Sequence, residues 1–344
     1  MTQPPNAAGT PARVTLRDVA ERAGVSRTTA SFVLSGRRDM RISADAERRV
    51  RQAARELNYR PSLLARSLRT NLSQTIGLLS DQIASEMFAG EVVRAALATA
   101  VRHEHLLFVG ETGGDPEVER NIIQGMIDRG VGGFVYASMY TQVVRVPTIL
   151  RKLPVVLLNC STRGKRLTNV VPDEVEAGRL VAGELLAHGH RDRIVLVGER
   201  TTQAVAGHDR LTGIREALAA AGAELAGLVD CLWWPDHAYR AVTEYLAQGH
   251  RPSAFICLND RIAFGAYQAI SDFGWSVPQD VSVISFDDSD LASWLRPALT
   301  SAAIPYFEMG RRSVELLMAP PADPEVHRVP MELTRRVSVA PPAG

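Results

Sequence analysis

The sequence has few cysteines, only two lysines and no long apolar run. Cys160, Cys231 and Cys257 lie far apart and form no CxxC or Cys/His spacing, so they indicate neither a disulfide framework nor a zinc site. No uncharged apolar stretch reaches the roughly 18 to 20 residues of a membrane span, and the opening MTQPPNAAGTPARV contains no apolar signal segment. We therefore expect a cytoplasmic protein that is neither exported nor inserted into a membrane.

Common catalytic and nucleotide-binding motifs are also absent. The chain contains no P-loop, GxSxG or HExxH pattern, and no GxGxxG between an expected strand and helix. His188 and His190 flank Gly189 at an expected helix end, where capping explains them better than metal binding. We therefore expect no catalysis, no metal and no cofactor.

Charge is divided unevenly along the chain. Residues 13–70 contain 14 arginines, no lysine and six acidic residues, and the overall charge of +1 leaves −7 for residues 71–344. A basic end on an acidic body is typical of a nucleic-acid-binding segment joined to a body that phosphate repels. Charge alone leaves open a second interpretation, a solvated arginine-rich helical surface.

Capping signals in the basic segment predict three short helices. Thr15 followed by Asp18 has the pattern of an N-cap with a carboxylate in the first turn, and Gly24 can end that helix. Ser26 can cap a second helix that runs to about residue 34, and Ser43 can cap a third. The first two helices, joined by a tight turn, form a helix-turn-helix. The small core expected between the three helices contains Val19, Val25, Val33, Val50 and Leu57.

The second helix is the expected DNA reader, because its N-terminal residues meet base edges in the major groove. Its exposed candidates are Arg27, Thr28 and Ser31, and Arg27 can make a bidentate contact with guanine. For each of them, a phosphate contact without sequence information remains an alternative. The expected contacts with the DNA backbone are Thr15, Ser26, Arg37, Arg41 and Arg69.

The basic segment carries two linked motifs, DVAxxAGVS in residues 18–26 and LNYRPSLLARSL in residues 57–68. Together they resemble the LacI/GalR family of bacterial repressors, and the resemblance extends over nearly the whole chain. It implies that residues 61–69 form a hinge helix that orders on operator DNA and pairs with its dimer mate in the minor groove. Leu68 matches the leucine that wedges between base steps, and Ala65 lies one turn before it.

Phe32 is where the reading helix departs from this resemblance. Several family members place an arginine there, whereas this chain has Phe32, preceded by Ala30. Phe32 can touch a thymine methyl group or pack within its own domain. The operator half-site therefore cannot be copied from a relative.

From residue 74 onward, short apolar runs alternate with amphipathic stretches. This βαβ rhythm predicts parallel sheets covered by helices. The expected strands are residues 75–79, 106–109, 133–136, 155–158, 194–197, 254–257 and 281–285. The expected helices are residues 90–102, 118–128, 174–187, 209–221 and 261–273.

The family resemblance implies an α/β body like that of periplasmic sugar-binding proteins, with two doubly wound lobes joined by three crossings near residues 172, 302 and 327. The expected fold is therefore an all-α helix-turn-helix head on a two-lobed body of doubly wound parallel sheets. The expected boundaries are a disordered tail at 1–13, a DNA-binding domain at 14–60, a hinge and linker at 61–73, and an effector-binding and dimerisation body at 74–344. Lobe one would take about 74–172 and 302–326, and lobe two about 173–301 and 327–344.

Polar residues follow several expected strands, at the ends where doubly wound sheets bind ligands. By their matching positions in the family, several of them would bind a small-molecule effector beside an aromatic wall. Amides, carboxylates and arginine bind hydroxyl pairs, and an aromatic face packs on a sugar ring, so the set suits a sugar. The expected effector residues are Asp81, Phe88, Asn159, Arg210, Trp234, Asn259, Asp260 and Asp287.

Other roles remain open for some of these positions. Asp260 and Asp288 can cap helices, Asn159 can satisfy a turn, and Trp233, the alternative to Trp234 as the wall, can be interior. Asn159 stands where lactose-type relatives carry an acid, so the family resemblance does not supply the sugar.

These parts predict a transcription regulator, most simply a repressor controlled by a small-molecule effector. Two chains would pair through their bodies and hold two reading helices about one DNA turn apart on a pseudo-palindromic operator. The effector would change operator affinity as an inducer or a corepressor. The chain ends in RRVSVAPPAG without a leucine heptad, which favours a homodimer. Two alternatives remain, a periplasmic-type sugar receptor without DNA function and a purine-responsive, corepressor-dependent repressor.

The two classes of DNA contact predict different mutational effects. Arg27→Ala should relax preference at one base pair by about 1 to 3 kcal/mol, because it removes a base contact. Arg69→Ala should weaken binding to all sequences alike. Fluorescence anisotropy with an in vitro selected operator and its single-base variants measures both, and a uniform loss for Arg27→Ala would make Arg27 a phosphate contact.

Overall fold

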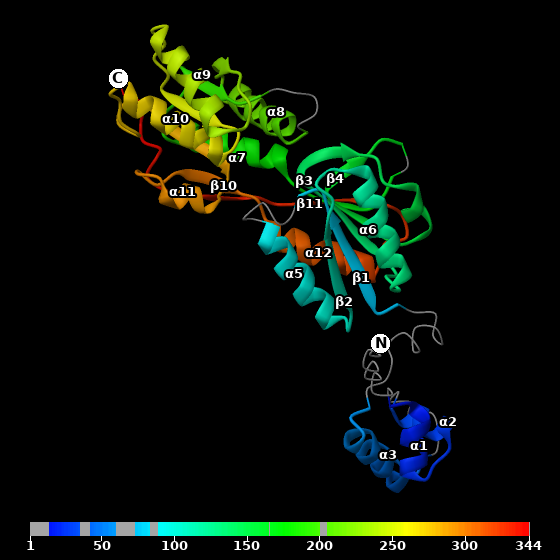
Figure 1. Ribbon diagram of the computed structural model, residues 1–344. Coiled ribbons are helices and arrows are strands. Elements are labelled where there is room, and N and C mark those ends of the chain that lie inside the picture. Colours follow the sequence, from blue (N-terminus) through cyan, green and yellow to red (C-terminus); the bar gives the residue numbers. More distant parts are fainter. Residues whose placement is uncertain are drawn as a thin grey trace, which may run out of the picture. The chain divides into compact units, whose positions relative to one another are not determined.

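A computed structural model describes residues 14–34, 42–59, 73–82, 89–164, 166–199 and 205–343 (Figure 1). The chain divides into two compact units, residues 1–73 and 74–344, which we call the head and the body. A helical head and a body of mostly parallel sheets with helices confirm the expected fold class. No helix in the described ranges is long and apolar enough to cross a membrane.

Three short helices make up the described part of the head. Val19, Val33 and Val50 are buried between them, and Val25 and Leu57 pack at the margin of this core, as the sequence predicts. The helices are α1 (Leu16–Ala23), α2 (Arg27–Leu34) and α3 (Ala44–Glu56).

The expected caps define the ends of these helices. Thr15 and Asp18 form a reciprocal capping box at the start of α1, which satisfies two backbone N–H groups. Gly24 ends α1 at φ 61°, a left-handed conformation that costs glycine little. Ser43 accepts a hydrogen bond from the first turn of α3. The sequence thus encodes the helix-turn-helix through local hydrogen bonds and a small core.

Two six-stranded sheets form the centre of the body. The first contains β1 (Thr75–Ser80), β2 (Leu106–Glu111), β3 (Phe134–Val144), β4 (Val155–Thr162), β5 (Asn169–Pro172) and β11 (Val326–Val329). The second contains β6 (Ile194–Val197), β7 (Leu225–Val229), β8 (Ala254–Cys257), β9 (Ser282–Asp287), β10 (Thr300–Ala303) and β12 (Glu332–Thr334). Their orders are β11-β5-β4-β3-β1-β2 and β12-β10-β9-β8-β6-β7. Only the pairing of β12 with β10 is antiparallel among these strands.

Helices cover both sheets and complete two lobes. Lobe one combines the first sheet with α5 (Ala89–Arg102), α6 (Pro116–Asp128), the short 3-10 helix η1 (Thr148–Lys152) and α12 (Tyr306–Met318). Lobe two combines the second sheet with α7 (Glu174–Ala187), α8 (Val205–Ala220), α9 (Pro235–Ala247), α10 (Asp260–Asp272) and α11 (Asp290–Trp294). β6 and β8 are apolar and buried along their whole length, as expected for parallel strands covered on both faces.

The chain passes between the lobes three times. β5 ends at Pro172 in lobe one and α7 begins at Glu174 in lobe two. β10 ends at Ala303 in lobe two and α12 begins at Tyr306 in lobe one, and the third passage runs from β11 to β12. β11 consequently lies beside β5, more than 150 residues earlier in the chain (Figure 1).

Several elements were not among those expected from the sequence. They are β5, β7, β10, β11, β12, η1, α9, α11 and α12. Polar residues, glycine or proline interrupt the missed strands, so no continuous apolar run marks them, unlike the four-residue strands β6 and β8. The expected strands and helices that fall in the described ranges are all present, with some ends shifted. The hinge helix expected at residues 61–69 lies outside the described residues.

Two glycines allow α7 and α8 to touch through their backbones. A Cβ on Gly178 would lie 2.2 Å from the carbonyl oxygen of Arg210, and one on Gly213 would lie 1.8 Å from that of Val175. Neither contact is possible for a real side chain, so only glycine fits at this crossing. The close approach sets Glu174, at the start of α7, against Arg210 on α8.

This crossing predicts that Gly178→Ala destabilises the body by about 1 to 3 kcal/mol or more, since the added methyl group forces the helices apart. Gly183→Ala on the same helix is the matched control, because a Cβ there meets nothing within 4 Å. The control should be neutral or stabilising by up to about 1 kcal/mol. Urea unfolding checks both, and equal effects of the two substitutions would contradict this account of the crossing.

Candidate functional site

A cavity of about 320 Å³ lies at the carboxyl ends of strands from both sheets. Its size falls at the lower end of the range for small-molecule sites, about 300 to 1,000 Å³. Five of the eight expected effector residues line it, namely Asn159, Arg210, Trp234, Asn259 and Asp287. Charged residues that were not expected there are Glu174 and Glu199.

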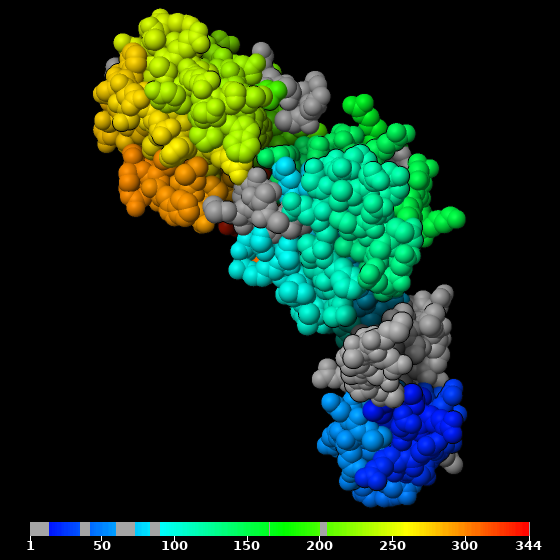
Figure 2. Space-filling model, in the orientation of Figure 1, coloured from blue at the N-terminus to red at the C-terminus, as the bar shows by residue number. Residues whose placement is uncertain are grey.

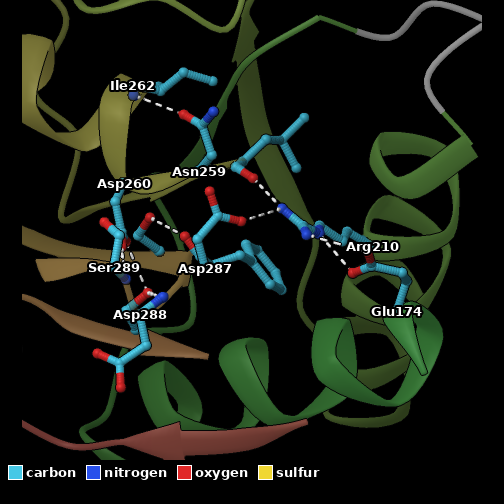
Figure 3. Close-up of polar contacts among 12 residues, drawn as sticks. Glu174, Arg210, Asn259, Asp260, Ile262, Asp287, Asp288 and Ser289 are labelled. Atoms are coloured by element: carbon cyan, nitrogen blue, oxygen red, sulfur yellow. Dashed lines mark hydrogen bonds and ion pairs between the residues drawn. The ribbon is translucent and has the colours of Figure 1, made fainter. Parts of the chain in front are cut away.

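Arg210 is the largest fully buried side chain in the described ranges, with 1% of its surface exposed. Its Nε and Nη2 donate to the two carboxylate oxygens of Glu174 at 2.7 and 3.1 Å. Its Nη1 donates to the carbonyl oxygen of Leu258 and lies 3.5 Å from Oδ1 of Asp287 (Figure 3). The planar guanidinium is therefore held in one orientation by three elements of lobe two.

Asp287 ends β9 and faces charges from three helices. Burial raises the pKa of Asp287 to about 8; Arg210 on α8 opposes this shift, while Asp260 on α10 and Glu174 on α7 add to it, and Arg261 lowers it. The φ of Asp287 is 103°, in a region that glycine alone adopts without strain. Such strain persists where the surrounding structure imposes it, often at functional sites.

Asn259 and Asp260 start α10 but have different surroundings. The side-chain oxygen of Asn259 accepts the backbone N–H of Ile262 at 2.7 Å, which leaves its amide nitrogen available to a ligand in the cavity. Asp260 does not line the cavity and is 1% exposed. Its carboxylate accepts from the backbone N–H and hydroxyl of Ser289 and from the hydroxyl of Ser301. Asp260 thus ties α10 to two following segments (Figure 3) and is not placed for the effector contact expected of it.

Asn159 lines the cavity from the middle of β4, at φ 57°. It accepts the hydroxyl hydrogen of Thr141 at 2.6 Å and donates to the carbonyl oxygen of Met139 at 2.9 Å. These bonds bridge the irregularity where β3 shifts register against β4. Asn159 therefore shapes the cavity wall with half of the hydrogen-bonding capacity of its side chain.

Asp81 lies in a different cavity of lobe one, of about 280 Å³. Its carboxylate accepts from the backbone N–H of Met139 at 2.9 Å and from the side chains of Ser138 and Gln142 at 3.1 and 3.2 Å. Gln142 lines both cavities. Asp81 thus orders the β3 segment behind the first cavity instead of lining it, which corrects the expectation of a direct effector contact.

Aromatic side chains from both lobes line the first cavity, Tyr140, Trp233, Trp234 and Tyr306. Trp234 is 51% exposed, and the guanidinium of Arg261 lies over its ring at 4.8 Å. The indole nitrogen of Trp233 is buried without a hydrogen-bond partner. A buried N–H donor without an acceptor is costly.

One of the two missed charged residues of the cavity carried a signal in the sequence. Glu199 follows the expected strand at 194–197 by two residues, within reach of the rule applied to the other strands. Glu174 follows β5, which was not expected because asparagine and proline leave only two apolar residues in it. Phe88 lies outside the described residues.

On α2, Arg27 and Thr28 are exposed, while Ser31 and Phe32 are half-buried. Thr15 caps α1, and Ser26 accepts the backbone N–H of Thr29 at 3.0 Å, so both also have a structural role. The remaining DNA-contact candidates, Arg37, Arg41, Ala65, Leu68 and Arg69, lie outside the described residues.

Comparisons with known proteins match both units. Residues 15–62 match the model of bacterial regulatory proteins of the lacI family, and residues 182–339 match the periplasmic binding protein-like domain. The HTH-type transcriptional repressor PurR of Pasteurella multocida is 32% identical over 307 residues, which cover 88% of this chain and 90% of the relative. The chain belongs to the LacI family.

Further relatives and solved structures are similar to this chain over most of its length. PurR of Erwinia tasmaniensis is 35% identical, covering 88% of this chain and 89% of the relative. A crystal structure of the lac repressor dimer bound to operator and the anti-inducer ONPF has a TM-score of 0.80 at 25% identity, covering 95% of this chain and 99% of that chain. The transcriptional regulator CelR in complex with cellobiose has a TM-score of 0.65 at 25% identity, covering 95% and 100%. This LacI-family chain is a DNA-binding transcription regulator and not an enzyme.

The raised pKa of Asp287 predicts that the body of this LacI-family chain loses stability as the pH rises. Between about pH 4 and pH 8 the folded chain keeps a proton that the unfolded chain has released, so the free energy of unfolding falls by at most about 1.4 kcal/mol per pH unit for this group. Asp287→Asn should flatten that slope in urea unfolding at several pH values. Asp260, whose pKa is also raised by burial, leaves a residual slope.

The exposed residue Asp236 supplies the control, since Asp236→Asn should leave the pH slope of the wild type. An unchanged slope in Asp287→Asn would show that this carboxyl group is ionised in the folded chain at neutral pH.

Proposed function

We propose that this chain is a repressor that binds a pseudo-palindromic operator as a homodimer and is controlled by a small molecule bound in the first cavity. The observation that carries this proposal is the convergence of five expected effector residues, from both lobes, on one cavity. A ligand there would contact two lobes that three passages of the chain connect, so binding would favour one arrangement of the lobes over another. Binding to chromosomal DNA would place the protein in the cytoplasm.

The effector is proposed to be a sugar or sugar derivative. The amide group of Asn259 and the carboxyl group of Asp287 can bind hydroxyl groups, and aromatic rings line the same cavity. The cellobiose complex of CelR is consistent with this class. A purine is the second candidate, because a planar ring can stack on the aromatic side chains of the same cavity.

DNA binding would change with effector in the full-length chain. An operator selected from random duplexes by the full chain, followed by a gel-shift titration with candidate sugars and purines, tests the linkage. We expect a change of about 5- to 150-fold in operator affinity, the usual range of such coupling. A ligand that demonstrably binds the cavity without changing operator affinity would refute the proposed control.

Dimerisation is proposed to involve the apolar outer surface of α5 and β2. Leu97 and Val101 lie one turn apart on α5 and are exposed, as are Leu106, Phe108 and Val109 on the edge strand β2. Figure 2 shows the cyan surface of α5 uncovered on this face of the body. An exposed apolar patch beside the edge strand of a sheet is typical of a protein–protein interface. The lac repressor relative is described as a dimer.

Val101→Glu should therefore shift the chain from dimer to monomer in sedimentation velocity, because a charge placed at an apolar interface is desolvated without a partner. Val326→Glu is the matched control. Val326 is similarly exposed, 49% against 61%, but lies on β11 at the opposite edge of the same sheet. Loss of the dimer in both variants, or in neither, would place the interface elsewhere.

A further inference from the structure

Arg210 offers little positive charge to a ligand. It is the only cationic residue among the described residues that line the cavity, and Glu174 neutralises it through a bidentate pair in which both side chains are 2% exposed. Three of its five N–H groups are already donated to Glu174 and Leu258. A phosphate or carboxylate entering the cavity would therefore find no unpaired cation among these residues.

Two acidic groups remain after Glu174 and Arg210 cancel. Glu199 is half-buried, lines the cavity and forms no hydrogen bond or ion pair with the described residues. Asp287 lies 3.5 Å from Arg210, and burial raises its pKa to about 8, so it keeps its proton at neutral pH. Glu199 is therefore the group of the described cavity wall whose negative charge a ligand cation can neutralise, while Asp287 offers oxygen atoms for hydrogen bonds.

The uncharged groups of the wall favour the same kind of ligand. The amide nitrogen of Asn259 can donate to a ligand hydroxyl group, because the side-chain oxygen of Asn259 is the atom that caps α10. Several aromatic rings line the cavity, and the face of an indole or phenol ring attracts cations as well as sugar C–H groups.

We propose that the effector carries a protonated amine on a hydroxyl-bearing ring, as an amino sugar does, and carries no phosphate or carboxylate. Its ammonium group is paired by Glu199 and donates to a carboxyl oxygen of Asp287, its hydroxyl groups bind Asn259, and the pairing of Arg210 with Glu174 leaves no unpaired cation on the described cavity wall for an anion. The inference rests on the proposed function and deepens it, because it concerns the ligand of the same cavity.

Isothermal titration of the full chain with matched sugars tests this charge preference. The probes are glucosamine, galactosamine and mannosamine, each compared with its parent hexose, its N-acetyl form and its 6-phosphate. At least one amine should bind about tenfold or more tightly than its uncharged counterparts, since charge-assisted hydrogen bonds are the stronger ones. Tighter binding by an uncharged or phosphorylated form, or no binding by any of the three amines, overturns the proposal.

Substitutions at the two glutamates locate the preference. Glu199→Gln should weaken amine binding about tenfold with little effect on the parent hexose, while Glu244→Gln, an exposed position on α9, should change neither. Glu174→Gln should free Arg210 and raise affinity for the 6-phosphate. If the buried substitution Glu174→Gln destabilises the chain, the comparison of Glu199→Gln with the wild type decides between the outcomes. A Glu199→Gln variant that still prefers the amine over the parent hexose overturns the proposal.

Failure of this inference is distinguishable from failure of the proposed function. A neutral sugar that binds the cavity and changes operator affinity contradicts the amine but supports the regulator. An amine that binds without changing operator affinity supports the charge preference and contradicts the control of DNA binding.

Discussion

The buried pair of Arg210 and Glu174 is the interaction on which the cavity depends. A guanidinium with 1% of its surface exposed is tolerable only with a matched carboxylate and satisfied donors, because removal of one partner leaves an uncompensated buried charge. The glycine crossing of α7 and α8 provides this match, since the backbones approach closely enough for Glu174 to meet the guanidinium with both oxygens. The close helix packing that Gly178 and Gly213 allow therefore also fixes the position of this ion pair.

The same pair determines the state of its neighbours. Arg210 opposes the burial that raises the pKa of Asp287, while Glu174 and Asp260 add to it, so the protonation of Asp287 reflects the balance of four buried groups. The carboxylate of Asp260 accepts hydrogen bonds from the hydroxyl groups of Ser289 and Ser301, and these bonds hold it away from the cavity. Of the carboxylates around β9, only Asp287 therefore remains directed to a ligand in the cavity.

Much of the head could be predicted from the sequence because its structure is local. Thr15, Gly24 and Ser43 each specify a helix end within a few residues of themselves. In the body, the wholly apolar strands β6 and β8 were found, but β5, β10 and β12 were not, since polar residues or proline interrupt them.

The errors at the site have the same origin. Asp81 and Asp260 follow strands as ligand-binding residues do. The carboxylate of each, however, already accepts hydrogen bonds from serine side chains and backbone N–H groups of other segments. Glu174 was missed because its role depends on Arg210, 36 residues later, and on a helix crossing that no local pattern reveals. A sequence indicates which residues lie at the carboxyl end of a strand. It does not indicate whether other parts of the protein already use the hydrogen-bonding groups of those residues.

The passages between the lobes explain how a small ligand could have a large effect. Glu174 begins directly after the first passage, and Ile304 and Tyr306 lie on the second, and all three line the cavity. Tyr306 is the first residue of α12, which packs into the core of lobe one. A ligand that contacts Tyr306 together with the lobe-two residues of the cavity therefore contacts both lobes. A ligand shifts a conformational equilibrium only by its difference in affinity between two states, and contacts on the connecting segments are the ones that change when the lobes move. A ligand bound in the cavity would therefore contact the segments that connect the lobes.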